Sequence, residues 1–207
     1  FRTRYGIDVS SFQGEIDWNA VADDNIDFAM VRVGFRGTGT GSLNTDKYYE
    51  QNIRGAMRAG LETGVYFFAQ AVTVEEAIEE ADYVISLLDG LDINGPVAYD
   101  WEMHDSTYRV YGTSPEMATA CAVAFCQRIK DAGYTPMVYG GTYVTYMKYD
   151  QGALADYLSW YPEYKSEKSE KLCPTLVYHM DYWQFSSSRA VAGINGRVDM
   201  NIQFIRR

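Results

Sequence analysis

Four acidic residues stand in segments that are otherwise apolar or aromatic. They are Asp8 in GIDVS, Asp100 and Glu102 in VAYDWEM, and Asp199 in RVDMN. Carboxylates are uncommon in such segments, because burying an unpaired charge is costly. A helix cap or an ion pair with arginine would explain any one of them equally well, but four together indicate a centre for acid–base chemistry.

The spacing of Asp100 and Glu102 suits a particular kind of reaction. In a strand, residues two apart project from the same face, with Cα atoms roughly 6–7 Å apart. Two carboxylates this close raise the pKa of one of them, so one group stays protonated near neutral pH while the other stays ionised. Hydrolysis of a glycosidic bond needs that division between a general acid and a second carboxylate.

An alternation of strand-like and helical segments must position these carboxylates. Short β-rich runs predict strands, and apolar residues at helical spacing between capping residues predict helices. The predicted strands are 5–9, 28–35, 64–71, 96–102, 135–141, 158–161, 177–186 and 197–204, the predicted helices are 16–25, 46–59, the run from Val74 to Leu88 and 114–133, and 164–171 is predicted to be an exposed loop.

This order predicts one α/β domain over residues 1–207, without an internal linker. Five βα units followed by three strands with few helices indicate a distorted TIM-like barrel built on a parallel sheet. A doubly wound open sheet is the alternative, but it would ordinarily need helices after the later strands too. In a barrel, catalytic groups lie at the carboxyl ends of the strands. Asp8, Asp100 and Glu102 fall at such ends, and Asp199 opens the last strand.

Composition narrows the class of protein. Hydrophobic residues make up 47% and charged residues 22%, which predicts a folded domain. A net charge of −10 argues against binding to nucleic acid or to anionic membranes. No segment approaches the roughly 20 apolar residues that insertion across a bilayer requires. Aromatic residues reach 15%, a surplus that suits a groove stacking sugar rings, although we expect about half of them in the core.

No cofactor or metal is expected from the sequence. It has two histidines, no Cys-x-x-Cys or His-rich spacing, and no phosphate-binding loop after its glycine-rich segment. Cys121 and Cys126 are five residues apart on a predicted helix and point to different sides, so we expect these and Cys173 to be free thiols. The chain opens almost directly into a strand, so a targeting segment is expected to have been removed.

The sequence resembles glycoside hydrolase family 25, the lysozymes of the Chalaropsis type. The resemblance covers about residues 5–204, with motifs in the order and spacing of the family. The similar segments are GIDVSSFQGEIDW, FAMVRVG, AGLETGVYFFAQA, PVAYDWE with its Asp-x-Glu core, TPMVYGG, WYPEY, and YWQFSSSRAVAGINGRVDMN with its closing Val-Asp-x-Asn.

This resemblance implies an N-acetylmuramidase that cuts the β-1,4 bond between N-acetylmuramic acid and N-acetylglucosamine with retention. It implies that Glu102 is the general acid and that Asp100 is either the nucleophile or the carboxylate that orients the substrate's N-acetyl group. Asp8 and Asp199 would be the other acidic residues of the centre. The implied glycan-binding residues are Tyr66, Tyr139, Trp160, Tyr164, Trp183 and Gln184.

Some positions depart from the family pattern. Pro162 stands where alanine is usual, and Phe67 stands where histidine commonly follows the strand-three tyrosine, which would alter one contact of the groove wall. Trp101 separates the two carboxylates where a smaller residue is common, and we expect it to pack outward against the helices. None of these changes removes an acid.

Two residues beside the predicted centre admit more than one interpretation. His104 follows Glu102 closely and would either tune the pKa of that acid or lie free in a solvated loop, the latter being the commoner situation. Arg32 in the second-strand motif is expected to hold Asp8 or another carboxylate in a structural ion pair.

The expected partner is the glycan of bacterial peptidoglycan, acted on by a monomer outside the cell or at the wall. A barrel that only binds glycan is one alternative, which the costly carboxylate pair argues against. A chitinase-like hydrolase of another amino-sugar polymer is a second alternative, because the same chemistry would serve it.

Overall fold

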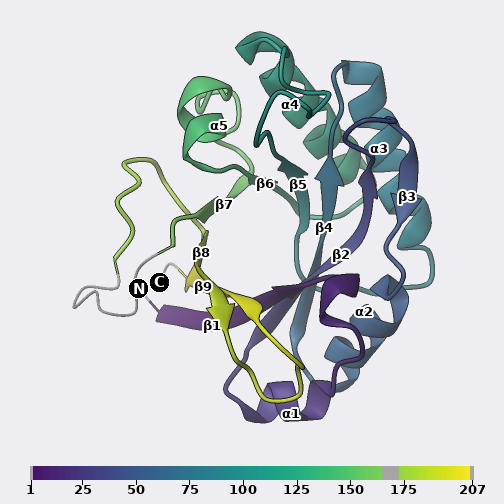
Figure 1. The fold of residues 1–207 in the computed structure, drawn as a ribbon, viewed down its shortest axis with the longest axis vertical. Coiled ribbons are helices and arrows are strands. Elements are labelled where there is room, and N and C mark those ends of the chain that lie inside the picture. The colour runs from purple at the N-terminus through teal and green to yellow at the C-terminus, as the bar shows by residue number, and fades with distance from the viewer. Residues whose placement is uncertain (1, 165–172, 206–207) are drawn as a thin grey trace.

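The computed structural model describes residues 2–164 and 173–205. Over this part of the chain, nine strands form one sheet in the order β1-β9-β8-β7-β6-β5-β4-β2-β3, and β1 also pairs with β2. That additional pairing closes eight strands into a barrel and leaves β3 outside it (Figure 1). The barrel predicted from the sequence is therefore confirmed. The predicted loop 164–171 lies, apart from Tyr164, outside the described residues.

The elements follow the predicted alternation of strand and helix. The strands are β1 (Arg2–Val9), β2 (Phe28–Arg36), β3 (Leu43–Thr45), β4 (Glu62–Ala69), β5 (Val97–Trp101), β6 (Pro136–Tyr139), β7 (Leu158–Pro162), β8 (Tyr182–Arg189) and β9 (Val198–Ile205). The helices are α1 (Trp18–Asp23), α2 (Tyr49–Arg58), α3 (Val74–Leu87), α4 (Pro115–Asp131), α5 (Thr142–Met147) and the 3-10 turn η1 (Ser11–Gln13).

The sheet is mixed, which corrects the expectation of a parallel one. The barrel strands from β1 through β8 pair in parallel, but β9 runs antiparallel to both β8 and β1. Its first residues therefore lie beside the carboxyl end of β1, where Asp199 pairs with Asp8. The reversal brings an acid from the start of a strand to the end of the barrel where the other strands finish.

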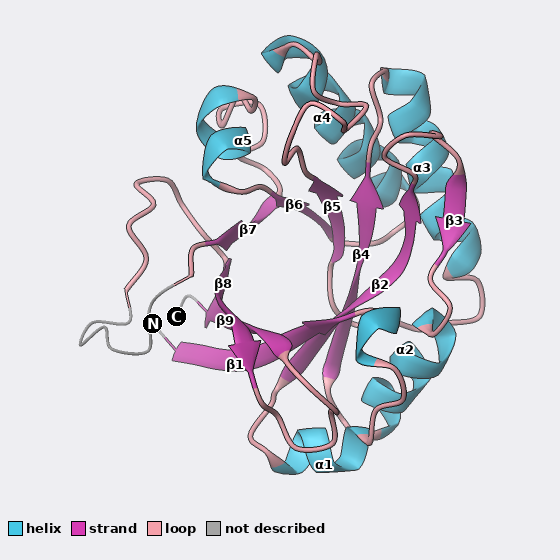
Figure 2. Cartoon of the chain, viewed as in Figure 1, coloured by secondary structure: helices cyan, strands magenta, loops and turns pink. Residues whose placement is uncertain are grey.

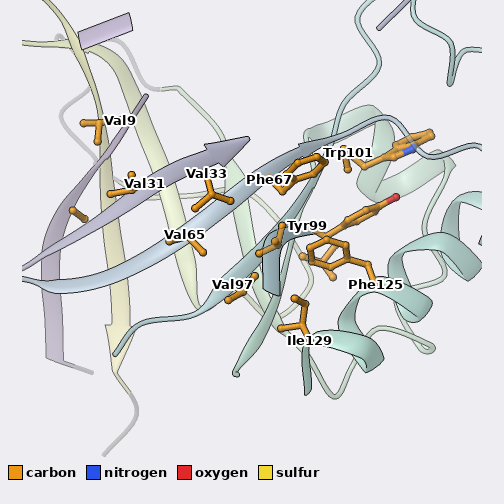
Figure 3. Close-up of a cluster of buried hydrophobic side chains, with 14 of the residues drawn as sticks. Val9, Val31, Val33, Val65, Phe67, Val97, Tyr99, Trp101, Phe125 and Ile129 are labelled. Atoms are coloured by element: carbon orange, nitrogen blue, oxygen red, sulfur yellow. The ribbon is translucent and has the colours of Figure 1, made fainter. Parts of the chain in front are cut away.

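Two apolar layers hold the barrel together because side chains alternate across each strand. Outward residues such as Val31, Val65 and Tyr99 belong to one buried cluster with residues of α4, in which the ring of Tyr99 lies 4.8 Å from that of Phe125 (Figure 3). The inner layer fills the barrel itself and consists of Phe28, Met30, Ala98, Met137, Tyr139, Trp160 and Tyr182. Gly6 belongs to this inner face because a Cβ there would lie 2.4 Å from the ring of Phe28.

Helices cover only part of the barrel. The longer helices α2, α3 and α4 lie outside β2, β4, β5 and β6, while β7, β8 and β9 are flanked mainly by loops (Figure 2). The helix after β6, α5, runs for only 6 residues. This asymmetry agrees with the predicted loss of helices from the last third of the chain.

Three local assignments differ from the prediction. Helix α5 was not predicted, since its sequence TYVTYM is rich in β-branched and aromatic residues that favour strands. The short strand β3 was also missed, and it forms by pairing with the end of β2. Strand β8 begins at Tyr182 and not at residue 177, because its ladder with β7 begins where Tyr182 meets Trp160.

Candidate active site

A pocket of about 610 Å³ opens at the end of the barrel where the parallel strands finish. All four acidic residues of the sequence prediction line it, together with five of the six predicted glycan-binding residues. These nine lining residues are Asp8, Asp100, Glu102, Asp199, Tyr66, Tyr139, Trp160, Tyr164 and Gln184.

Asp100 and Glu102 come from the end of β5. Asp100 is 5% exposed and points into the barrel, while Glu102 is the first residue after the strand and its side chain is 24% exposed. Glu102 lies close enough for its charge to act on the carboxyl group of Asp100. Burial and the charge of Glu102 raise the pKa of Asp100 well above its ordinary value. In the free protein a proton is therefore held on the deeper side of the pair.

His104 contacts the acid directly. Its Nε2 lies 2.6 Å from Oε2 of Glu102, on the solvent side of the pocket, and its side chain is 62% exposed. The ring also packs edge-on against Tyr108, with the ring centroids 5.3 Å apart. Glu102 thus lies between a buried carboxyl group and an exposed imidazole, and His104 is a solvated loop residue that also contacts the proposed acid.

Asp8 and Asp199 form a second carboxyl pair, from β1 and β9. Asp8 is 6% exposed, and its Oδ2 accepts hydrogen bonds from Nε2 of Gln184 and Nδ2 of Asn201, both at 2.8 Å. Burial and the charge of Asp199 raise the pKa of Asp8 to about 8. Asp8 therefore holds a proton at neutral pH.

Aromatic residues and amides form the rest of the floor and wall. The hydroxyl groups of Tyr139 and Tyr164 both donate to Oε1 of Gln184, at 3.1 Å and 3.0 Å. Trp160 is 3% exposed and donates from Nε1 to Oδ1 of Asn201 at 2.8 Å. Gln184 and Asn201 thus connect the aromatic wall to Asp8 and fix its orientation.

Strand periodicity corrects two wall assignments. Trp183 does not line the pocket, because it neighbours Gln184 on β8 and projects to the opposite face, where it packs with Tyr161 and Phe185. Phe67 is likewise fully buried outside the barrel, 6.2 Å from the ring of Tyr83, so its departure from the family pattern leaves the wall unchanged.

Trp101 points outward as expected, whereas Arg32 pairs with a carboxylate other than Asp8. Trp101 is fully buried in the outer layer. Arg32 forms a 2.9 Å ion pair with Asp46, the residue after β3, and not with Asp8. Its guanidinium also lies 5.1 Å from the ring of Phe12, which lines the pocket and is 83% exposed.

Several pocket residues were not singled out in the sequence. Phe12 and Tyr143 line the rim from η1 and α5, and Asn201 holds Asp8 from β9. Asn201 could have been found, since it is two residues beyond Asp199 on the same strand face. Tyr143 could not, because its placement depends on the unpredicted helix.

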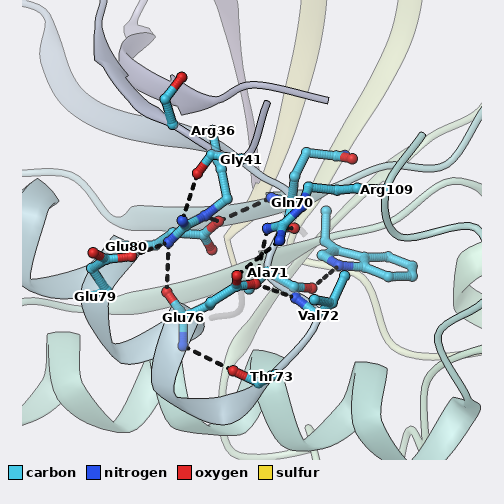
Figure 4. Close-up of polar contacts among 12 residues, drawn as sticks. Arg36, Gly41, Gln70, Ala71, Val72, Thr73, Glu76, Glu79, Glu80 and Arg109 are labelled. Atoms are coloured by element: carbon cyan, nitrogen blue, oxygen red, sulfur yellow. Dashed lines mark hydrogen bonds and ion pairs between the residues drawn. The ribbon is translucent and has the colours of Figure 1, made fainter. Parts of the chain in front are cut away.

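A buried polar cluster lies behind the end of β5 (Figure 4). Arg36 pairs with Glu79 and Glu80 of α3, both at 2.7 Å, and Arg109 pairs with Glu76 at 2.8 Å. These groups surround the backbone of residues 70–72, in the loop between β4 and α3. The cluster ties together the loops that follow β2, β4 and β5.

Other chemical groups in the described residues give no second centre. Across residues 2–164 and 173–205, no group of three or more His, Cys, Asp or Glu side chains is placed to hold a metal ion. The three cysteines are free, as predicted, with Cys121 and Cys126 buried and Cys173 exposed. No helix in the described part of the chain combines the length and apolarity needed to cross a membrane.

Comparison with known proteins places the chain in a family. The family model for "Glycosyl hydrolases family 25" matches residues 7–194, and the chain belongs to that family. Among curated relatives, it is 26% identical to the autolytic lysozyme of Clostridium acetobutylicum over 197 residues, covering 95% of this chain and 54% of that protein. The chain thus spans about half the length of that relative.

Solved structures agree with this assignment. The modular autolysin LytC of Streptococcus pneumoniae, in complex with a synthetic peptidoglycan ligand, superposes with a TM-score of 0.79 at 26% identity, covering 98% of this chain and 47% of that one. A bacterial lysozyme from Streptomyces coelicolor superposes with a TM-score of 0.76 at 25% identity, covering 96% and 90% of the two chains.

Proposed function

We propose that this protein is a lysozyme that hydrolyses the β-1,4 bond between N-acetylmuramic acid and N-acetylglucosamine in bacterial peptidoglycan. The observation that carries the proposal is the carboxyl pair of Asp100 and Glu102, which lines a 610 Å³ pocket at the end of a family 25 barrel. The lysozyme activity named for two of the similar proteins supports the same reaction.

Glu102 is the general acid in this proposal. Its carboxyl group is the more exposed of the pair, so a glycosidic oxygen bound in the pocket can reach it. Asp100 is too deeply buried to meet the leaving group, but it faces the same space from below. The two groups thus divide the work between proton donation and stabilisation of the reacting sugar.

Substrate binding would place the proton on the correct group. In the free protein the raised pKa of Asp100 favours a proton on that buried carboxyl group. A sugar whose acetamido N–H donates to Asp100 favours the ionised form of that carboxyl group, because a hydrogen bond to a carboxylate lowers its pKa. The proton then passes to the neighbouring Glu102, which delivers it to the glycosidic oxygen.

The reaction would proceed with retention through the substrate's own acetamido oxygen. Asp100 is deeply buried, and its Oδ1 has no hydrogen-bond partner among the described residues, so it can accept a hydrogen bond from an acetamido N–H. This supports Asp100 as the group that orients the acetamido and not as the nucleophile. Glu102, left ionised after the first step, would take a proton from the water that completes hydrolysis.

The glycan would lie along the aromatic wall. Tyr66, Tyr139, Trp160 and Tyr164 line the pocket, and Gln184 supplies a polar group between them. Aromatic rings offer flat apolar faces to sugars, and the polar tips of Tyr139, Trp160 and Tyr164 are already engaged within the wall. Such an enzyme acts outside the cell or at the wall, and we propose that it works there as a monomer.

Analysis of the products tests the proposal. The purified protein is incubated with peptidoglycan, and new reducing ends are identified by mass spectrometry after borohydride reduction. Ends on N-acetylmuramic acid are the expected result. Ends on N-acetylglucosamine would indicate a glucosaminidase or chitinase-like enzyme, and binding to several wall types without any new ends would indicate a barrel that only binds glycan.

A further inference from the structure

The amide of Gln70 reaches the backbone of the proposed acid. Gln70 is the residue after β4, its side chain is fully buried, and its Nε2 donates to the carbonyl oxygen of Glu102 at 2.8 Å. The ladder between β4 and β5 ends at the pair Ala69 and Trp101, so Glu102 lies one residue beyond the last strand pairing. The side chain of Gln70 thus supplies the hydrogen bond that the sheet no longer provides.

Gln70 is itself held at two further points. Its backbone N–H donates to Oε1 of Glu80 at 3.0 Å, and its carbonyl oxygen accepts from Nη1 of Arg109 at 2.9 Å (Figure 4). Arg36, 4% exposed, secures Glu80 through a 2.7 Å contact. With its main chain fixed on both sides, the Gln70 amide has little freedom to leave the carbonyl that it contacts.

A second bond joins the same two segments. The indole Nε1 of Trp101 donates to the carbonyl oxygen of Ala71 at 3.1 Å. Trp101 at the end of β5 and Glu102 just beyond it are therefore each hydrogen-bonded to the loop that begins at Gln70. The loop after Glu102 is tied as well, because Arg109 contacts both Gln70 and Glu76.

This arrangement lowers the stability of the fold, because it leaves buried polar atoms unpaired. Oε1 of Gln70 and Oε2 of Glu80 are buried and have no hydrogen-bond partner among the described residues. A buried polar atom left unpaired costs its full desolvation, so an apolar side chain would fill this space more economically. Polar groups retained at such a cost, directly behind a reacting group, indicate a role in that group's placement.

We propose that Gln70 is a positioning residue that fixes the general acid Glu102 through its backbone carbonyl, with Glu80, Arg36 and Arg109 holding Gln70 in place. The inference rests on the proposed function of Glu102. The side chain of Glu102 leaves the chain at a point where no strand partner restrains it, so the Gln70 bond sets the direction of the carboxyl group toward Asp100 and the substrate.

The first test replaces the amide without emptying its space. Gln70→Met keeps a similar volume but cannot donate to the carbonyl. We expect kcat on peptidoglycan to fall roughly 10- to 100-fold with KM changed less than about three-fold, because displacing a catalytic group by about 1 Å costs on that order. Unchanged kcat in this variant, with the wild type active, would overturn the inference.

The second test uses pH to restore the hydrogen bond to the carbonyl oxygen of Glu102. In Gln70→Glu, a protonated carboxyl group can donate to the Glu102 carbonyl, whereas an ionised one repels it. Burial favours the protonated form of this carboxyl group. The charged groups around this position are Glu76, Glu79 and Glu80 on α3, Arg36 on β2, and Glu102 and Arg109 in the segment after β5. We expect its kcat relative to wild type to be highest at acidic pH and to fall as the pH rises.

Two controls distinguish a role of Gln70 in positioning Glu102 from a general loss of stability. The kcat of Gln70→Met relative to wild type should not vary with pH in the same way, because methionine does not titrate. Asn52→Leu replaces another fully buried amide, on α2 away from the pocket, and should leave kcat unchanged. Equal pH dependence in the Met and Glu variants, or an equal loss of kcat in Asn52→Leu, would make Gln70 merely structural. Inactivity of the wild type would instead overturn the proposed function, and this inference with it.

Discussion

The two carboxyl pairs at the barrel end have similar chemistry but different surroundings. Asp8 and Asp199 face each other across β1 and β9, and amides of Gln184 and Asn201 satisfy Asp8. In the pair on β5, Oδ1 of Asp100 is buried without a hydrogen-bond partner among the described residues. The pair on β5 therefore has unused hydrogen-bonding capacity, and the pair on β1 and β9 has much less.

This difference indicates which pair gains a hydrogen bond from the substrate. A buried carboxyl oxygen without a partner is costly, so it is retained where a ligand supplies the missing donor. The amide-bound pair, in contrast, is already organised before any substrate arrives. We therefore expect changes to the pair on β5 to affect turnover most, and changes to the pair on β1 and β9 to affect both stability and turnover.

The largest expected effect follows from Glu102→Gln. The substitution keeps the shape of the side chain but removes the proton that Glu102 gives to the glycosidic oxygen in the proposed mechanism, so kcat should fall roughly 10³- to 10⁴-fold. Release of reducing ends from peptidoglycan measures the loss, and a thermal unfolding curve like that of the wild type shows that the fold is intact. A rate near that of the wild type would remove Glu102 from the role of acid.

Asp100→Asn should have the next largest effect. An amide cannot carry the charge that stabilises the reacting sugar, and it cannot pass a proton to Glu102, so we expect kcat to fall about 10³-fold. Turnover rates with the same peptidoglycan preparation test this. A loss smaller than that caused by Asp8→Asn would reverse the ranking of the two pairs and move the second catalytic role to Asp8 or Asp199.

Asp8→Asn is expected to reduce kcat by roughly 10- to 100-fold, because it disturbs placement and not proton transfer. It should also stabilise the fold. The pKa of Asp8 rises from 3.8 to about 8 on folding, so the native state binds more protons than the unfolded state between these values. The stability that the wild-type residue contributes therefore falls as the pH rises through this window.

Because asparagine does not titrate, it removes this penalty while its amide can still donate toward Asp199. The free energy of unfolding of Asp8→Asn should exceed that of the wild type by a few kcal/mol at pH 8 and by little near pH 4. Denaturant unfolding at the two pH values measures the difference. A variant less stable than the wild type at pH 8 would show that Asp8 is held ionised.

The smallest expected effect is that of His104→Gln. Nε2 of His104 contacts Oε2 of Glu102 at 2.6 Å from the exposed side of the pocket. Removing this contact should change kcat/KM by only about two- to five-fold, because contacts between exposed polar groups contribute little. Turnover of peptidoglycan by the variant and the wild type under the same conditions measures the change, and an unchanged kcat/KM would mean that His104 does not act on the acid.

The local sequence pattern was enough to predict the strands and helices and the positions of the acidic residues along them. Asp8 and Asp100 are the next-to-last residues of β1 and β5, because the apolar runs end there. Helix α4 begins after Ser114, whose hydroxyl accepts from the N–H of Met117, as the Ser-Pro start predicted. Strict alternation would also have separated Trp183 from Gln184, since adjacent strand residues cannot both face the pocket. Assigning both to the groove overlooked that rule.

Contacts between distant segments could not be predicted from the sequence in the same way. Arg32 pairs with Asp46 and not Asp8, and the carbonyl of Glu102 meets Gln70. Which carboxyl group holds the proton also depends on depth: the spacing predicted that one pKa is raised, but only burial identified Asp100 as that group. The sequence alone determined the barrel and the residues at its catalytic end, because periodicity and strand ends are local properties. Tertiary structure decided their partners and protonation, because desolvation and hydrogen bonding depend on what the rest of the chain places around them.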